Sequence, residues 1–284
     1  MVKLHSNPVT ASDLSDYLKT SDDFQFEQDV FRSCLKGGFP AQHGGTYQDP
    51  VTKKDRQFDI RMCVTKGLCR LKLAIECKNL RANFPLLVSR VQRRPEESFH
   101  EVILSGASRY QDAVFMGSNT RAATHKTKGP VTLYQSRQFV GKATVQVGRT
   151  PNGDLTTGDA EVYEKWAQAI ASAFDLVSQS VRDFERTDRR NAYSVVIPVL
   201  VVADGSLWTA DYSEQGELLA EPSPCEECTI FIGKKISTRG VDYEMSHLHV
   251  FTKTKFDGYL DRVTVNDKYW DLIFPSDQLS RSGA

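Results

Sequence analysis

Apolar residues recur at intervals of three and four near the N-terminus, the spacing of a helix with one buried face. Gly37 and Gly38 follow this stretch, and glycine commonly ends a helix because it enters the left-handed conformation without strain. The pattern therefore predicts a helix from Asp23 to the glycine pair. Its apolar positions are Phe24, Phe26, Val30, Phe31, Cys34 and Leu35.

The next forty residues change to an alternating pattern, in which successive side chains lie on opposite faces of a strand. Residues 39–49 form a first predicted strand, which ends at the Asp49-Pro50 turn. Residues 57–64 and 70–78 form two more, joined by a tight turn at Gly67. The second strand of this hairpin has an apolar row of Leu71, Leu73, Ile75 and Cys77 and an opposite row of Lys72, Ala74, Glu76 and Lys78.

The remaining pattern predicts a mixture of helices and strands. Helices are expected over residues 104–115 and 159–183, and a mobile polar loop over residues 117–130. A β-branched run predicts a strand buried on both faces at residues 195–203. Further strands are expected at residues 207–212, 229–236 and 247–254.

No internal repeat or low-complexity linker divides the chain, so one elaborated domain is expected. Residues 1–22 form a polar N-terminal segment and residues 23–212 the main body. A basic insertion occupies about 81–155, and residues 213–284 form a β-rich extension of the same domain.

Charge is balanced overall but not locally. The chain has 36 Lys and Arg and 36 Asp and Glu, which argues against a polycationic coat or packaging protein. Residues 70–149 nevertheless hold 14 basic and five acidic residues. This local excess is explained either by a solvated face or by a surface that meets an anion.

The longest apolar run, residues 195–203, is far shorter than the roughly 20 residues of a membrane-spanning helix. The first ten residues also lack the apolar stretch of a secretory signal. We therefore expect a cytoplasmic protein with no membrane partner, whose six cysteines are reduced.

The candidate chemistry lies on the hairpin. Glu76 and Lys78 are two residues apart on one strand, so their side chains share a face. The turn at Gly67 brings Asp59, on the preceding strand, beside Glu76. Two adjacent carboxylates repel each other unless a cation lies between them, and a hard divalent ion prefers such oxygen ligands. The alternative is an ordinary surface pair, worth about 0–1 kcal/mol.

At these residues the sequence resembles the PD-(D/E)xK nuclease superfamily. The resemblance lies in Glu27 on the first helix, Arg56-Gln57-Phe58-Asp59-Ile60 on one strand and Ala74-Ile75-Glu76-Cys77-Lys78 on the next. It implies an α/β fold with a restriction-endonuclease-like core, a mixed central sheet flanked by helices. It also implies Mg²⁺ as cofactor, for which Mn²⁺ substitutes.

The resemblance implies specific roles. Asp59, Glu76 and the backbone carbonyl of Cys77 are implied as metal ligands, with Glu27 as a further metal or water ligand. Lys78 is implied as the catalytic lysine, and Lys165 or Gln168 on the later helix as an additional polar residue of the site.

The expected function is therefore metal-dependent hydrolysis of phosphodiester bonds in DNA, in restriction, defence or repair. An RNA-directed nuclease and an inactive binding or interaction module on the same fold stay open, as do a homodimer and a larger defence complex. Expected contacts to the nucleic-acid backbone are Arg93, Arg94, Arg121, Lys126, Lys128 and Lys142.

Two weaker candidates accompany this site. Cys225 and Cys228 supply half of a zinc site that His247 and His249 would complete, but two reduced thiols in a turn are favoured. His43, beside two glycines, is interpreted as a turn residue or as a group that approaches substrate from the mouth of the sheet.

Overall fold

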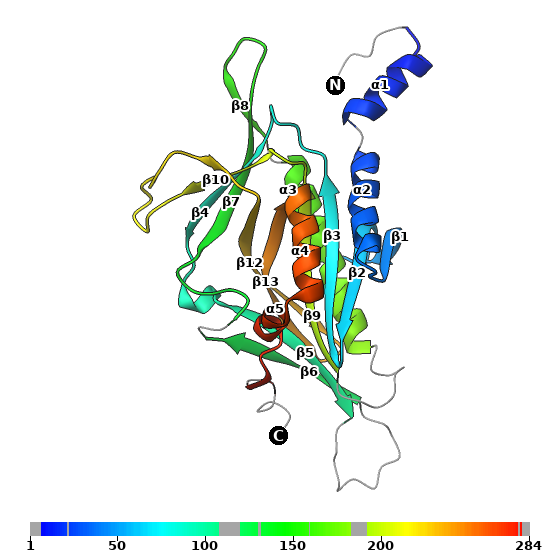
Figure 1. The fold of residues 1–284 in the computed structure, drawn as a ribbon, viewed down its shortest axis with the longest axis vertical. Coiled ribbons are helices and arrows are strands. Elements are labelled where there is room, and N and C mark those ends of the chain that lie inside the picture. The colour runs from blue at the N-terminus through cyan, green and yellow to red at the C-terminus, as the bar shows by residue number, and fades with distance from the viewer. Residues whose placement is uncertain are drawn as a thin grey trace, which may run out of the picture.

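A computed structural model describes residues 7–21, 23–107, 120–129, 132–158, 160–182, 192–277 and 279. Of residues 19–21, 106–107 and 120–121 it describes the backbone alone. Within these ranges the chain forms one large mixed sheet flanked by helices, which confirms the expected α/β class (Figure 1). No helix in the described ranges is both long and apolar enough to span a membrane.

Five α-helices are formed by the described residues, together with one short 3₁₀ turn at Pro95–Glu97. The helices are α1 (Ala11–Ser21), α2 (Asp23–Lys36), α3 (Ala160–Arg182), α4 (Lys253–Val265) and α5 (Asp267–Ile273). The predictions for α2 and α3 are confirmed within the described part of the chain.

The sheet runs in the order β1-β2-β3-β9-β13-β12-β7-β4-β10-β11, with β5, β6 and β8 attached beside this path. The strands are β1 (Ala41–Gln48), β2 (Asp55–Lys66), β3 (Cys69–Lys78), β4 (Leu86–Gln92), β5 (Phe99–Ala107), β6 (Thr120–Lys128), β7 (Phe139–Arg149), β8 (Leu155–Gly158), β9 (Ala192–Val202), β10 (Leu207–Asp211), β11 (Ser223–Pro224), β12 (Glu227–Thr238) and β13 (Val241–Thr252).

Helices pack against both faces of strand β3. Its apolar row packs with α2, α4 and α5, whereas Ala74 on the other face packs against α3. The expected alternation of faces is therefore correct, but both faces are covered. Lys72 and Glu76 are buried as a result, with 7% and 1% of their surface exposed.

Two expectations about the middle of the chain are wrong. Residues 104–107 belong to β5 rather than to a helix, because β5 pairs with both β6 and β9; residues 108–115 lie outside the described residues. Residues 120–128 form β6 rather than a loop, since each pairs with a residue of β5. Among the strands that the structure describes, β6 pairs only with β5 and so forms an edge, where a polar sequence is common.

The C-terminal strands are part of the main sheet, because β13 pairs with β9 and β12 pairs with β7. The extension also contains α4 and α5, which the sequence pattern did not predict. The last predicted strand ends early, at Thr252, because α4 begins at Lys253.

Pro198 lies inside β9, a strand paired on both sides. Proline has no N–H for a ladder hydrogen bond, so it is unusual in such a position. On one edge β9 pairs with β5 at residues 192–194 and with β13 at residues 199–202. Pro198 lies between these two stretches, and the Tyr243 hydroxyl donates to the Val196 carbonyl there, 3.4 Å away. The gap makes the proline compatible with a central strand.

Candidate active site

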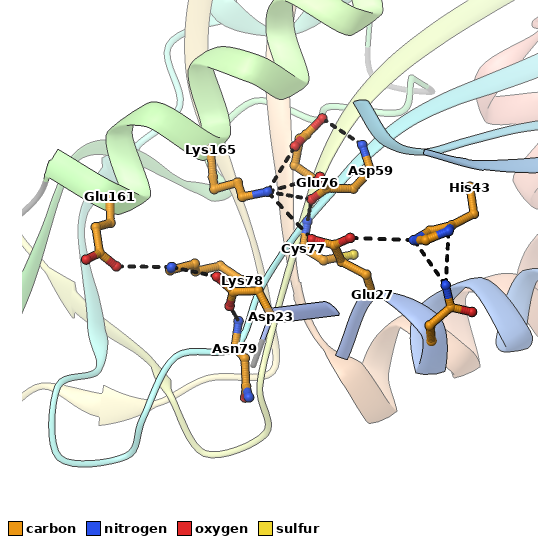
Figure 2. Close-up of polar contacts among 11 residues, drawn as sticks. Asp23, Glu27, His43, Asp59, Glu76, Cys77, Lys78, Asn79, Glu161 and Lys165 are labelled. Atoms are coloured by element: carbon orange, nitrogen blue, oxygen red, sulfur yellow. Dashed lines mark hydrogen bonds and ion pairs between the residues drawn. The ribbon is translucent and has the colours of Figure 1, made fainter. Parts of the chain in front are cut away.

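The β2–β3 hairpin places Asp59 beside Glu76, as the sequence predicts (Figure 2). Antiparallel pairing continues to Ile60 opposite Ile75, and Asp59 comes just before this pair. The Cys77 N–H donates to Asp59 Oδ2 at 2.8 Å, and the Asp59 N–H donates to Glu76 Oε1 at 3.4 Å. These backbone bonds hold both carboxylates at the end of the hairpin.

The ammonium group nearest these carboxylates is that of Lys165, on α3. Its Nζ lies 2.7 and 3.0 Å from the two oxygens of Asp59 and 3.5 Å from Glu76 Oε2. It also lies 3.9 Å from Glu27 Oε1 on α2. One cation is thus shared by three carboxylates from three elements (Figure 2).

Burial makes the charge balance of this cluster unusual. It raises the pKa of the Glu76 carboxyl well above its ordinary value, and the neighbouring Asp59 raises it further, while Lys165 opposes both. Burial alone lowers the pKa of Lys165, but the charges of Asp59 and Glu76 more than offset this, so its pKa is raised. The carboxylates therefore favour the charged form of the Lys165 ammonium that they share.

Lys78 lies in the same cleft but contacts other residues. Its Nζ donates to Asp23 at 2.8 Å and lies 3.0 Å from Glu161. Asp23 also accepts from the Asn79 N–H at 2.9 Å, which fixes its position (Figure 2). None of the contacts described for Lys78 is to Asp59 or Glu76. Sequence reasoning missed Asp23 and Glu161, because neither lies in the hairpin motif.

Several of these residues line an open cleft of about 780 Å³, but Glu76, which is 1% exposed, is not among them. Lys78, Lys165 and Gln168 line it together with Glu27 and Asp59. Its lining comprises Phe24, Glu27, His43, Gly44, Gly45, Thr46, Asp55, Arg56, Gln57, Phe58, Asp59, Lys78, Glu161, Glu164, Lys165 and Gln168.

His43 lines this cleft from the edge strand β1. It lies 3.5 Å from Glu27 Oε2, and its Nδ1 is 3.0 Å from Gln28 Nε2. Of its two sequence-based interpretations, the structure shows the one that places His43 at the cleft. The adjacent Gly44 has φ +61°, a conformation that favours glycine.

The expected nucleic-acid contacts differ in exposure and in their partners. Arg93 is only 3% exposed, so its expected role as a backbone contact disagrees with its burial. Lys126 and Lys142 are each paired with a carboxylate, Lys126 with Glu244 at 2.7 Å and Lys142 with Glu97 at 2.6 Å.

Two of the expected contacts face solvent. The Arg94 side chain is 69% exposed and lies 4.0 Å from Glu96. Lys128 is also exposed, at the end of β6. The side chain of Arg121 lies outside the described residues.

The zinc alternative is not supported by the strand register. Cys228 pairs with Val250 and Thr229 with His249, so the cysteine and the histidine lie on opposite faces of the β12–β13 pair. His249 Nε2 shares a 2.7 Å hydrogen bond with the Tyr134 hydroxyl, and His247 Nε2 accepts from Arg93 Nε at 3.1 Å. The Nε2 atom of each imidazole is thus engaged, although His247 Nδ1 is buried without a hydrogen-bond partner among the described residues.

Among the residues that the structure describes, no three His, Cys, Asp or Glu side chains form a preassembled metal-binding group. The donor chemistry of the cleft nevertheless fits a hard divalent cation, because Asp59, Glu76 and Glu27 offer carboxylate oxygens. The Lys165 ammonium stands among these oxygens where such a cation would be held.

No protein-family model, curated protein or solved structure matches this chain. The functional argument therefore depends on the geometry of the cleft and on the residues of the hairpin.

Proposed function

We propose that this protein is a divalent-metal-dependent nuclease that hydrolyses phosphodiester bonds in DNA. The observation that carries the proposal is the convergence of Asp59, Glu76 and Lys165 from two strands and a helix at an open cleft. The resemblance of the hairpin residues to PD-(D/E)xK nucleases supports the same reading, and so does the sheet covered by helices on both faces.

Asp59, Glu76 and the carbonyl of Cys77 would hold Mg²⁺, with Glu27 as a further ligand. When bound, the ion would lower the pKa of a coordinated water and neutralise charge on the scissile phosphate. The resemblance assigns the catalytic ammonium to Lys78, which lines the cleft. Lys165 compensates the carboxylates and supplies a second positive charge to a phosphate held there.

The proposed activity requires the Lys78 ammonium to exchange one of its present contacts for the substrate phosphate. Asp23 and Glu161 hold its ammonium, and none of the contacts described for it is to Glu76. A substrate phosphate would compete with the Glu161 carboxylate, which is 74% exposed and therefore holds Lys78 weakly. We therefore expect substrate to draw Lys78 away from Glu161.

The test is a cleavage assay on single-stranded DNA, double-stranded DNA and RNA, with Mg²⁺, with Mn²⁺ and with a chelator. Asp59→Asn, Glu76→Gln and Lys78→Ala should each reduce cleavage by more than about 100-fold. Loss of a group that only supports a metal ligand typically costs about 10–100-fold, so loss of a ligand or catalytic group should cost more. Asp242→Asn is the control, because Asp242 is exposed on β13 and does not line the cleft.

The outcomes separate the alternatives. Cleavage of RNA alone would replace DNA as the substrate. Metal-independent cleavage, or equal loss in Asp242→Asn, would contradict the assigned site. Binding of nucleic acid without cleavage of any substrate would instead support an inactive module on this fold.

A further inference from the structure

A second cavity, of about 310 Å³, is separate from the cleft and shares none of its lining residues. Three arginines from two regions of the chain line it: Arg90 on β4, Arg93 just after β4, and Arg262 on α4. We call it the arginine cavity. Tyr259, Tyr269 and Phe139 contribute aromatic rings, and Gln135 and Gln138 contribute amides.

Arg93 is the unusual group of this cavity, because it is a buried cation with uncharged partners. Its Nε donates to His247 Nε2 at 3.1 Å, and its Nη1 to the Gln135 carbonyl at 2.7 Å and Gln138 Oε1 at 3.3 Å. Its Nη2 donates to Thr229 Oγ1 at 2.7 Å. A buried charge is normally paired with an opposite charge, because leaving water is costly.

The nearest carboxylate that acts on Arg93 does not relieve this imbalance. Burial lowers the pKa of Arg93, and Tyr134 and Glu97 oppose that effect only in part. Glu97 itself accepts a 2.6 Å hydrogen bond from Lys142. The Arg93 guanidinium therefore keeps an electrostatic preference for an anion.

The other two arginines retain hydrogen-bonding capacity toward the cavity. A guanidinium has five N–H groups. Arg90 binds Asp211 through Nε and Nη2, at 2.7 and 2.9 Å. Arg262 binds Glu227 through Nη2 alone, at 3.1 Å, and its Cζ lies 5.7 Å from the ring centres of both Tyr259 and Tyr269.

We propose that the arginine cavity binds a nucleoside monophosphate. A phosphate monoester carries a charge between about −1.5 and −2 at neutral pH and accepts hydrogen bonds from several guanidinium groups at once. The tyrosine and phenylalanine rings suit a planar base, and glutamine amides pair with the polar edge of a base. The volume lies at the lower end of the range of ligand pockets, roughly 300–1,000 Å³, so it suits one nucleotide rather than a chain.

Lys255 provides a matched control for Arg262. Both residues lie on α4, both side chains are 35% exposed, and both contact Glu227, at 3.8 Å for Lys255 and 3.1 Å for Arg262. Only Arg262 lines the cavity. Arg262→Gln and Lys255→Gln therefore remove similar surface charges, but only the first changes the proposed site.

The experiment is calorimetric titration of the full chain, in chelator, with each of the four common nucleoside 5′-monophosphates, with inorganic phosphate and with adenosine. We expect at least one nucleotide to bind more tightly than phosphate or adenosine. Arg262→Gln should weaken that binding at least tenfold, Arg262→Lys should weaken it less, and Lys255→Gln should leave it unchanged.

Absence of binding by all four nucleotides at millimolar concentration would overturn the proposal. So would equal affinity for inorganic phosphate, or equal loss in Lys255→Gln. If Arg262→Gln does not fold, Arg262→Lys decides, because it keeps the positive charge beside Glu227 but lacks the planar fork. Nuclease activity does not enter this test, so its failure leaves the proposed function unaffected.

Discussion

The active-site cleft and the arginine cavity have opposite charge imbalances. Five Asp and Glu and three Lys and Arg line the cleft, whereas three Arg and one Glu line the cavity. The carboxylates of the cleft meet α3 on one face of the sheet, and the cavity lies against α4 and α5 (Figure 1). In the cleft, buried acids share a lysine from another element. In the cavity, a buried arginine is held by neutral groups.

The difference shows two ways in which a fold can hold charge away from water. Lys165 compensates Glu76 directly, so the cleft remains paired when no ligand is present. Arg93 has its hydrogen bonds, but none of those described is to a charged group. The first arrangement suits a ligand that is a cation and replaces the lysine. The second suits an anion, which completes the pairing.

The largest expected effect comes from removing the shared lysine. Lys165→Met should lower the free energy of unfolding in chelator by about 3–5 kcal/mol, because it leaves Glu76 and Asp59 buried without their ammonium. Lys78→Met should cost less, since its partner Glu161 is 74% exposed. Urea unfolding of both variants measures this, and equal losses would contradict it.

Divalent metal should affect the stability of Lys165→Met and of the parent protein differently. Mg²⁺ should stabilise Lys165→Met more than the parent protein, because the ion no longer competes with an ammonium for the carboxylates. Repeating the urea series with Mg²⁺ gives the result, and Lys78→Met, whose lysine does not contact Asp59 or Glu76, is the control. An identical gain in all three proteins would argue against metal at Asp59 and Glu76.

A smaller effect on the free energy of unfolding is expected at acidic pH, through His249, which lines the arginine cavity. Burial lowers the pKa of His249 to about 3, and the charges of Arg93 and Arg262 contribute. The unfolded chain therefore binds a proton there near pH 6.5 while the folded chain does not, so this stability is complete above pH 6.5 and is lost as pH falls. His249→Gln should reduce the loss by about 1.4 kcal/mol per pH unit between pH 6 and 4.

Urea unfolding from pH 7 to 4 measures that slope. Glutamine can still accept the hydrogen bond from the Tyr134 hydroxyl, so the variant keeps this contact of His249. A slope equal to that of the parent would show that His249 does not titrate on unfolding as its burial requires.

The smallest expected effect concerns Arg94, the exposed neighbour of Arg93. Arg94→Ala should leave stability unchanged and reduce the salt dependence of DNA binding by about one unit of slope, the value for one phosphate contact. Arg32→Ala is the control, because its side chain is 64% exposed but lies outside the basic segment. If both variants show the same salt dependence of DNA binding, Arg94 does not contact DNA.

Local pattern predicted the parts of the site that lie close in sequence. Alternation along the hairpin was enough to place Asp59 beside Glu76, because a tight turn fixes the register of two antiparallel strands. It also placed Lys78 on the face of Glu76, but it could not show that Asp23 and Glu161 hold the Lys78 ammonium.

Contacts between distant segments account for the rest. Lys165 was one of two candidates on its helix, and only the packing of α3 against β3 selects it. The polar composition of β6 resembled a loop because an edge strand needs few apolar residues. The arginine cavity combines residues from β4, β7, β12 and two C-terminal helices, so no local spacing indicates it.

The proline in β9 divides the hydrogen bonds along one edge of this strand. Residues 192–194 are held by β5 and residues 199–202 by β13, with no ladder bond from Pro198 itself. Opening of the β5–β6 hairpin therefore need not break the pairing of β13, which adjoins the cavity. In hydrogen exchange, the amides on either side of Pro198 in β9 should therefore be protected to different extents. The two ends of β9 would then belong to two separate units of local unfolding.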